Sequence, residues 1–301
     1  MTASKQYDVI VIGGGAAGLF CAFTAGQRGR SVLVLDSSNK VGKKILMSGG
    51  GRCNFTNLDI QPDNYLSANP HFCKSALNGY NQWQFIEMVE RHQIGYHERK
   101  HGELFCDNSA KDILTMLLDE CEQAGVSINT KCDIQAIANK ERGFRLQTSL
   151  GSYHCQSLVV ATGGLSIPTM GATGFGYEIA EQFGLDLLPR TAGLVPFTFT
   201  DWVKPICESL SGLAVDVEMS VNGVSFRENL LFTHRGISGP AALQLSSYWQ
   251  PGQTISINLL PDMDAHQLLL SYKKSSAKSL LRNLLSQHLS KGLVLELQQR
   301  Y

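Results

Sequence analysis

The stretch Tyr7-Asp8-Val9-Ile10-Val11-Ile12-Gly13-Gly14-Gly15-Ala16-Ala17-Gly18 decides the fold. Its first half is an unbroken β-branched run, as expected for a strand that is covered on both faces. Its second half follows the pattern G-x-G-x-x-G, in which successive glycines make the turn, admit a pyrophosphate and let the helix pack closely. The free N–H groups at the start of that helix favour an anion. The residues predicted to bind a dinucleotide here are Gly13, Gly15, Ala16, Ala17 and Gly18.

The residues that follow extend the same unit. A helix is predicted over 16–28 and a second apolar strand over 31–35, which ends in Asp36. Asp36 and Ser37 are predicted to bind the cofactor. Asp36 has the spacing of an acid that accepts ribose hydroxyls, and its charge would repel a 2′-phosphate. NADP is therefore disfavoured at this position. The alternative interpretation is a glycine-rich strand–helix turn that binds nothing.

Composition narrows the class of protein. The chain has 301 residues, of which 43% are hydrophobic and 17% are charged, and its 26 basic and 26 acidic residues cancel. Bulk charge gives no sign of a nucleic-acid or membrane surface, so neither partner is predicted. No signal-peptide layout precedes the first strand, which predicts a cytoplasmic protein. The eight cysteines show no C-x-x-C pair or zinc spacing, so free thiols and no metal are expected.

A second unusual stretch runs from Gly42 to Asn57 and contains three consecutive glycines beside basic residues. Three glycines in a row cost backbone entropy, which a close approach to a flat or anionic ligand would explain. A mobile surface loop is the alternative. Cys53 has no cysteine partner before Cys73, so it is expected to line the site rather than form a redox disulfide. The predicted cofactor-binding residues are Lys43, Lys44, Ser48, Gly51, Arg52, Cys53 and Asn54.

The next elements predict a sheet edge. Helices are expected over 83–92 and 110–124, a third parallel strand over 126–129, and an antiparallel meander over 132–138, 144–148 and 153–157. A further buried strand over 158–161 ends in small residues. Ligands of open α/β sheets bind at such edges. Ala161, Thr162, Gly163 and Gly164 are therefore predicted to contact the cofactor.

The pattern changes near Pro189. Strands are predicted over 194–200, 213–221, 224–232 and 254–258, with a two-residue hairpin turn at Asn222-Gly223, and helical structure over 264–301. His234 and Arg235 lie in a glycine-bounded turn. They are predicted to contact substrate, against the alternative of ordinary exposed side chains.

These stretches together resemble the two-dinucleotide-binding-domain flavoproteins and, within them, the BaiN-type family of FAD-dependent oxidoreductases. The matching stretches are Val11–Gly18, Gly42–Asn57 with its Ser-Gly-Gly-Gly-Arg-Cys-Asn core, Ala161–Gly176 and Leu231–Pro240. The resemblance implies non-covalent FAD, with its ribose on Asp36 and its flavin beside the Ser48–Asn54 loop. It also implies that the adenine lies against the backbone of Ile134.

The resemblance implies an α/β protein in three parts. Residues 1–190 would form a Rossmann-like FAD-binding domain with a parallel sheet and an antiparallel meander. Residues 191–260 would form an inserted β-rich domain, and residues 261–301 a small helical domain. Such flavoproteins return to the FAD domain at their C-terminus. That segment is not found before Tyr301, so a truncated chain is expected.

Three functions remain open at this point. The first is an FAD-dependent oxidoreductase that transfers hydride to or from a small organic substrate, with NAD(P)H as a transient donor. The others are an FAD oxidase of a small amine or alcohol, and a flavin-binding protein without turnover. Lys44 and Arg52 are candidates for a positive charge beside the flavin. No residue stands out as an acid or base, and the oligomeric state is not predicted.

Overall fold

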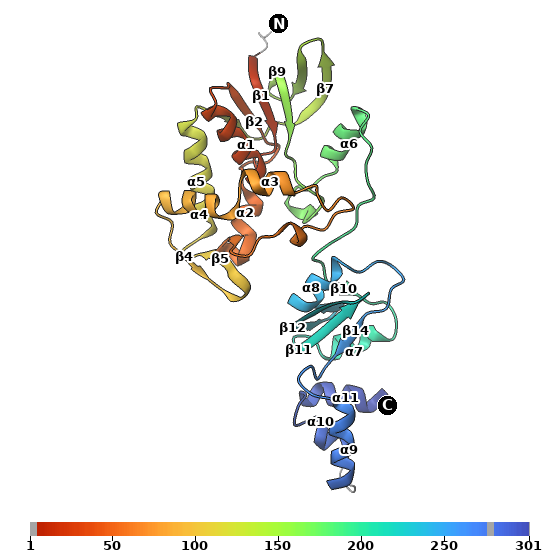
Figure 1. Cartoon of the computed structure of the whole chain (residues 1–301). Coiled ribbons are helices and arrows are strands. Elements are labelled where there is room, and N and C mark those ends of the chain that lie inside the picture. Colours follow the sequence, from red (N-terminus) through yellow and green to blue (C-terminus); the bar gives the residue numbers. More distant parts are fainter. Residues whose placement is uncertain (1–4, 276–279, 301) are drawn as a thin grey trace. The chain divides into compact units, whose positions relative to one another are not determined.

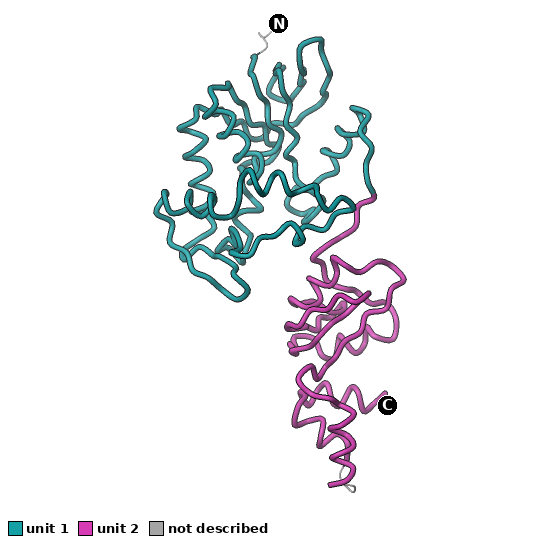
Figure 2. Tube along the Cα trace, viewed as in Figure 1, with its two compact units in different colours: residues 1–188 teal, residues 189–301 magenta. Residues whose placement is uncertain are grey.

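The computed structural model describes residues 5–275 and 280–300. It contains two compact units, unit 1 (Met1–Leu188) and unit 2 (Pro189–Tyr301), and each is described by itself (Figure 2). Residues 1–4, where the sequence shows no signal-peptide layout, lie outside the described residues, as do 276–279 and 301 of the predicted helical stretch. The predicted domain boundaries after residues 190 and 260 stay predictions.

Unit 1 is built on a six-stranded sheet with the order β6-β2-β1-β9-β8-β7 (Figure 1). Its strands are β1 (Lys5–Ile12), β2 (Val32–Leu35), β6 (Ser127–Asn129), β7 (Ile134–Lys140), β8 (Gly143–Thr148) and β9 (Gly151–Val160). β1 pairs in parallel with β2 and β9, whereas β7, β8 and β9 pair antiparallel. The predicted α/β fold with a parallel sheet and a meander is confirmed.

The boundary between meander and parallel sheet was predicted wrongly. Strands were expected over 153–157 and 158–161, but β9 is continuous from Gly151 to Val160. Its first half pairs with β8, while β1 runs beside it from Tyr153 to Val160. The meander therefore extends the parallel sheet instead of forming a separate layer, since one long strand belongs to both.

The strand pattern explains why both faces of the sheet are covered. Successive side chains of a strand point to opposite faces. Val11 belongs to the core beneath α1 (Ala16–Gln27) and α5 (Ala110–Gln123), whereas Ile10 and Ile12 belong to the core on the meander side with Ile179 of α6 (Phe175–Gln182). A β-branched run such as Val9–Ile12 suits a strand of this kind.

Glu120 of α5 is a buried acid that joins three helices of unit 1. Its side chain accepts hydrogen bonds from Arg91 Nη2 at 2.7 Å and Gln27 Nε2 at 3.0 Å, and lies 2.7 Å from His92 Nε2. Burial acts to raise the pKa of Glu120, but the hydrogen bonds with His92 and Arg91, together with their Coulombic attraction, outweigh it and hold the pKa below its ordinary value. Glu120 thus stabilises the packing of α1, α4 (Gln82–Arg91) and α5 in its ionised form.

We expect Glu120→Gln to lower the free energy of unfolding by about 1–3 kcal/mol at pH 7, because hydrogen bonds to a charged group are lost. A lowered pKa means that this stabilisation is complete above the unfolded-state pKa and disappears as the pH falls through the folded-state pKa. Urea unfolding of both proteins from pH 7 to pH 3 measures the difference. Glu122→Gln, at an exposed position on the same helix, is the control. If the difference in free energy of unfolding between wild type and Glu120→Gln did not shrink toward pH 3, this account would be contradicted.

The stretch 42–57 contains regular structure that the sequence did not predict. It forms α2 (Lys43–Met47), the 3-10 turn η1 (Ser48–Gly51) and β3 (Asn54–Asn57). β3 joins β5 (Glu103–Cys106) and β4 (Tyr96–Glu98) in a three-stranded sheet. Gly49, Gly50 and Gly51 have φ values of 56°, 66° and 89°, which L side chains rarely adopt. Backbone conformation therefore explains the three glycines. The remaining short elements of unit 1 are η2 (Pro62–Asn64), α3 (Lys74–Gly79), η3 (Lys100–Gly102) and η4 (Pro168–Met170).

Unit 2 contains a five-stranded sheet with the order β10-β13-β12-β11-β14. The strands are β10 (Phe197–Thr198), β11 (Ala214–Val221), β12 (Val224–Thr233), β13 (Gly236–Ser238) and β14 (Ser256–Asn258). The hairpin at Asn222-Gly223 is confirmed, with φ values of 49° and 78° as a two-residue turn of this type requires. The strand predicted over 194–200 is reduced to β10, whose partner β13 is itself only three residues long.

The helices of unit 2 are α7 (Val203–Ser209), α8 (Pro240–Ser246), α9 (Ala265–Ser275), α10 (Leu281–Leu285) and α11 (Lys291–Arg300). Leu289, Leu293 and Val294 are buried in the same core as the sheet residues Val217 and Leu230. The last helices therefore share a core with the β-sheet. Within the part of the chain that the structure describes, no helix is both long and apolar enough to span a membrane.

Candidate functional site

Unit 1 has a cavity of about 1480 Å³ at the carboxyl ends of β1, β2 and β9. Sites for small molecules commonly measure about 300–1,000 Å³. This cavity, hereafter the unit 1 cavity, is therefore large enough for a dinucleotide. The predicted site residues that line it are Gly13, Gly15, Ala16, Ala17, Asp36, Ser37, Lys43, Lys44, Ser48, Cys53, Asn54, Ile134, Ala161, Thr162, Gly163 and Gly164.

The three motif glycines have three different surroundings. A Cβ on Gly13, whose φ is +106°, would lie 2.4 Å from the carbonyl oxygen of Ala161. A Cβ on Gly18 would lie 1.8 Å from the carbonyl oxygen of Gly13, so α1 packs directly on the turn. A Cβ on Gly15 would have no atom within 4 Å. The space beside Gly15 is thus open toward the unit 1 cavity, which it lines.

The N-terminus of α1 faces the same space. Among the described residues no side chain caps this helix, and its first turn contains no acidic residue. The first N–H groups of a helix have no partner within it and carry partial positive charge. Open space and free N–H groups together fit a bound phosphate or pyrophosphate.

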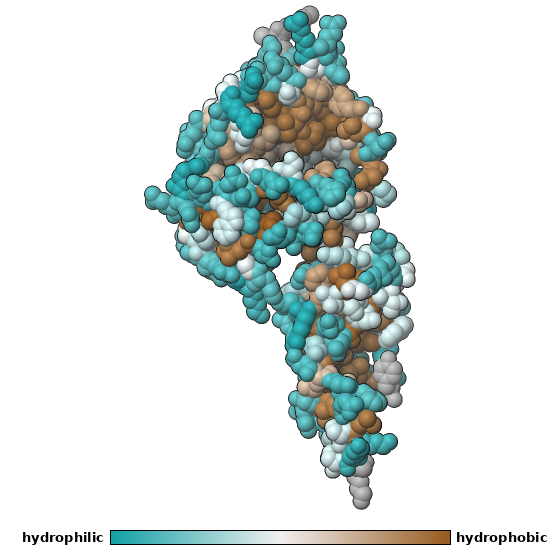
Figure 3. Space-filling model, viewed as in Figure 1, coloured by the Kyte–Doolittle hydropathy of each residue, from teal (hydrophilic) through white to brown (hydrophobic). Residues whose placement is uncertain are grey.

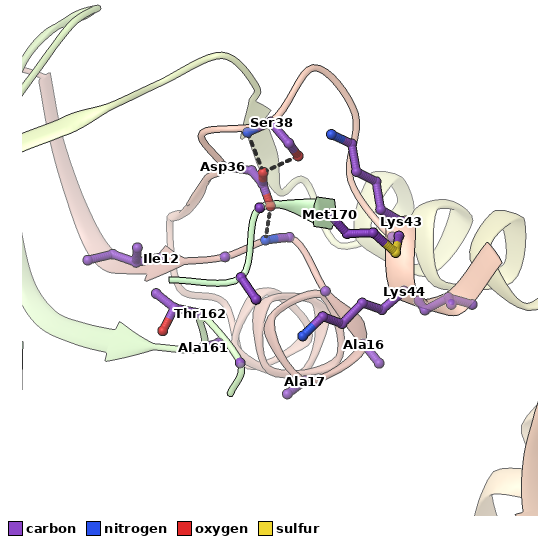
Figure 4. A pocket seen from close by; sticks show the side chains of 18 of the residues that line it. Ile12, Ala16, Ala17, Asp36, Ser38, Lys43, Lys44, Ala161, Thr162 and Met170 are labelled. Atoms are coloured by element: carbon purple, nitrogen blue, oxygen red, sulfur yellow. Dashed lines mark hydrogen bonds between the residues drawn. The ribbon is translucent and has the colours of Figure 1, made fainter. Parts of the chain in front are cut away.

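Asp36 is held by the turn that it faces (Figure 4). Its Oδ2 accepts the Gly14 N–H at 2.7 Å, and its Oδ1 accepts both the N–H and the hydroxyl of Ser38. A carboxylate has about four acceptor positions, so one remains on Oδ2. The prediction assigned two ribose hydroxyls to Asp36. In this arrangement there is an acceptor position for one.

Lys43 and Lys44 extend from α2 along the cavity (Figure 4). Lys44 Nζ donates to the Gly164 carbonyl at 3.3 Å and to Ser166 Oγ at 3.0 Å. It therefore links α2 to the loop after β9 and keeps a cation beside Gly163 and Gly164. A cation in this position complements an anionic ligand.

The Ser48–Asn54 loop contributes part of the wall. Ser48, Cys53 and Asn54 line the cavity, and Asn54 Nδ2 donates to Glu103 Oε1 at 3.3 Å. Burial raises the pKa of the Cys53 thiol, and a hydrogen bond with Ser48 opposes that rise only in part. Cys53 is therefore a protonated thiol at neutral pH. It is also a free cysteine, as are the other seven.

Five predicted site residues lie elsewhere. Gly18 lies behind the turn, and neither Gly51 nor Arg52 lines the unit 1 cavity. The Arg52 side chain is exposed, while its carbonyl accepts the Cys106 N–H at 3.0 Å. His234 and Arg235 form the exposed turn between β12 and β13 in unit 2. Their predicted contact with substrate stays a prediction.

The wall of the cavity opposite α2 was not predicted from sequence. Residues of η4, the loop after it and the start of α6 line this wall, and they include Thr169, Met170, Thr173, Phe175, Tyr177 and Glu178. Ser38 and Lys40 were missed on the near side. Ser38 carried a usable signal, since a serine two residues after an aspartate often bonds to it in a local turn. The described residues contain no group of three His, Cys, Asp or Glu side chains that could hold a metal ion.

The family described as HI0933-like protein Rossmann domain matches residues 7–213, and the HI0933-like protein barrel and H2TH domain matches residues 191–301. A ribosomal RNA dihydrouridine synthase of Escherichia coli is 54% identical over 98% of this chain and 74% of its own length. Its counterpart in Haemophilus influenzae is 48% identical over 97% of this chain and 74% of its own. A 3-dehydro-bile acid delta(4,6)-reductase of Clostridium scindens is 26% identical over 86% of this chain and 66% of its own.

These relatives overturn two predictions. A small organic substrate was expected, but the two relatives with about half of their residues in common are named for ribosomal RNA. Nucleic acid was excluded as a partner, and the same names contradict that exclusion. The bile acid reductase, which is the BaiN-like relative, is only 26% identical to this chain. The resemblance to BaiN-type flavoproteins therefore holds only at the level of the wider family. Matches to both halves and 54% identity over almost the full chain lead to one assignment: the chain belongs to the HI0933-like family.

Proposed function

We propose that this chain is an FAD-dependent oxidoreductase that reduces uridine to dihydrouridine in ribosomal RNA. The observation that carries the proposal is the 54% and 48% identity, over 98% and 97% of the chain, to two ribosomal RNA dihydrouridine synthases. The reaction adds two hydrogens across the C5–C6 bond of uracil. With NAD(P)H as the donor it balances as uridine, NAD(P)H and a proton giving dihydrouridine and NAD(P)⁺.

The residues of the unit 1 cavity fit FAD. The open space at Gly15 and the uncapped N-terminus of α1 suit its pyrophosphate, and the free position on Asp36 Oδ2 suits a ribose hydroxyl. We expect the adenine to lie beside Ile134 and the flavin beside Ser48, Cys53 and Asn54, as the family resemblance implies; all four residues line the cavity. When bound, FAD supplies the hydride-transfer chemistry that side chains lack.

The chain's own contribution is to bind and to orient. Backbone N–H groups and Lys43 offset the charge of the pyrophosphate, while Lys44 fixes the 163–166 loop through Gly164 and Ser166. That loop closes one side of the cavity, so Lys44 both positions the wall and keeps positive charge near the cofactor. A cation beside bound FAD would stabilise negative charge on it, which is the role proposed for Lys44.

The test is the chemical product. Ribosomal RNA from an Escherichia coli strain that lacks its own ribosomal RNA dihydrouridine synthase is incubated with the protein, FAD and either NADH or NADPH. We expect nucleoside mass spectrometry to detect dihydrouridine, formed only with the complete mixture. Full reduction of the flavin by the donor without any dihydrouridine in the RNA would refute the proposed substrate.

A further inference from the structure

Basic residues are concentrated in the last helices of unit 2. Residues 265–301 contain six Lys or Arg residues and a single acidic one, Glu296, whereas the preceding 264 residues contain 20 basic and 25 acidic residues. The neutral total thus hides a strong local excess of positive charge. Clustered cations of this kind produce the electrostatic attraction that dominates the affinity of proteins for nucleic acids.

The cations of this segment face solvent. Lys273 and Lys274 end α9, Arg282 lies in α10, and Lys291 begins α11, and all four side chains are exposed. Within residues 5–275 and 280–300 none of the four has a carboxylate partner. Glu296 accepts a hydrogen bond from Ser209 Oγ at 2.6 Å. Four cations are therefore available for phosphates.

Helix stability explains the positions of the two lysines in α9 but not that of Lys291. Lysines in the last turn of α9 complement the helix dipole, so Lys273 and Lys274 have a structural reason to be there. Lys291 is the first residue of α11, whose first turn has no acidic residue. A cation at a helix N-terminus is unfavourable for that helix. Lys291 thus opposes the stability of its own helix, which favours a role in binding an external anion.

The segment is also firmly anchored. Leu293 and Val294 of α11 are buried in the core that contains the β-sheet of unit 2. At the end of α11, Arg300 donates to the Trp202 carbonyl at 3.2 Å, and its guanidinium carbon lies 5.2 Å from the centre of the Trp202 ring. Trp202 is 61% exposed. An exposed aromatic ring next to a guanidinium is a surface on which an unpaired base can stack.

We propose that Lys273, Lys274, Arg282 and Lys291, with the Trp202–Arg300 pair, form a docking surface for ribosomal RNA. These residues are hereafter the basic helical surface. Figure 3 shows hydrophilic side chains over this end of unit 2, with hydrophobic ones between them. The inference rests on the proposed RNA substrate and adds where that RNA binds, outside the unit 1 cavity. An anionic membrane is the competing partner for a basic helix that also exposes leucines such as Leu269.

The test measures RNA binding without turnover. Fluorescence anisotropy with labelled ribosomal RNA is recorded over a range of salt concentrations for wild type, Lys273→Glu/Lys274→Glu and Arg282→Glu/Lys291→Glu. We expect each double variant to bind at least about 10-fold more weakly and to reduce the slope of log K against log salt by about 1–2, as the loss of two phosphate contacts predicts. The matched control is Lys140→Glu/Arg142→Glu, at exposed positions where β7 turns into β8.

The second double variant separates binding from folding. An acid at the start of α11 favours the helix, so Arg282→Glu/Lys291→Glu is expected to stay folded, and urea unfolding of the variant checks this. The proposal that the basic helical surface binds RNA would be wrong if both double variants bound ribosomal RNA as tightly as wild type, or if wild type did not bind it. Loss of binding to phosphatidylglycerol vesicles with unchanged RNA binding would assign the surface to a membrane instead. Salt-dependent binding that is lost in the variants, in a protein that makes no dihydrouridine, would support the surface and refute the proposed function.

Discussion

Gly15→Glu will leave the protein folded but unable to retain FAD. No atom lies within 4 Å of the position of the new Cβ, and Gly15 lines the unit 1 cavity, so the substitution causes no clash at the backbone and the new side chain has open space beside it. A carboxylate at the N-terminus of α1 favours the helix but repels the pyrophosphate proposed to bind there. Like charges brought together cost several kcal/mol, which corresponds to at least about 100-fold in affinity.

The measurement is titration of the apoprotein with FAD, followed by flavin fluorescence, together with urea unfolding. We expect Gly15→Glu to lose binding while its free energy of unfolding changes by less than about 1 kcal/mol. Gly79→Glu is the matched control, since Gly79 also has open space around it but does not line the cavity. Unaltered FAD affinity in Gly15→Glu would show that the glycine turn is not the pyrophosphate site.

Several elements of unit 1 could be predicted from local sequence. The β-branched run of β1, the glycine turn and the helix predicted over 110–124, which is α5, each depend on residues close together in the chain, and the structure has all three. The extent of β9 could not be read in this way. Its continuity depends on pairing with β1 and with β8 at once, and both pairings are distant in sequence.

The residues of the candidate site show the same difference between what local sequence predicts and what depends on distant contacts. Residues at the ends of β1, β2 and β9 were predicted because a strand followed by small or acidic residues is visible in sequence. The wall formed by η4 and α6 was not, because its residues are ordinary in type and reach the cavity only through tertiary folding. Arg52 is the opposite case: it stands in a distinctive motif, yet its exposed side chain does not line the cavity, and its predicted contact with the cofactor stays a prediction.

The exclusion of nucleic acid failed for a physical reason. Equal numbers of basic and acidic residues give a net charge of zero, and that sum says nothing about where the charges lie. Ions in water are screened beyond a Debye length of about 8 Å at physiological salt, so an RNA responds to the nearest charges rather than to the total. A search for local charge excess would have singled out residues 265–301, where one acid accompanies six cations.

Gly18→Ala will destabilise unit 1 by about 2–4 kcal/mol, although glycine to alanine within a helix normally stabilises by about 0.5–1 kcal/mol. Gly18 lies in the first turn of α1, and its added Cβ would lie 1.8 Å from the carbonyl oxygen of Gly13. Backbone atoms cannot rotate away, so α1 must move off the turn. That movement also separates the turn from Ala161, whose carbonyl lies close beside Gly13.

Gly79→Ala provides the comparison, because Gly79 is also helical but has no atom within 4 Å of its Cβ position. We expect it to match or slightly exceed wild type in urea unfolding, while Gly18→Ala unfolds at a clearly lower urea concentration. The diagnostic result is a lower free energy of unfolding for Gly18→Ala, since helix propensity alone predicts that alanine raises it at both positions. A Gly18→Ala protein as stable as wild type would mean that α1 does not pack on the turn as closely as the structure has it. In that case the conclusion that this glycine is required by packing, whereas Gly15 is required by the ligand, would be wrong.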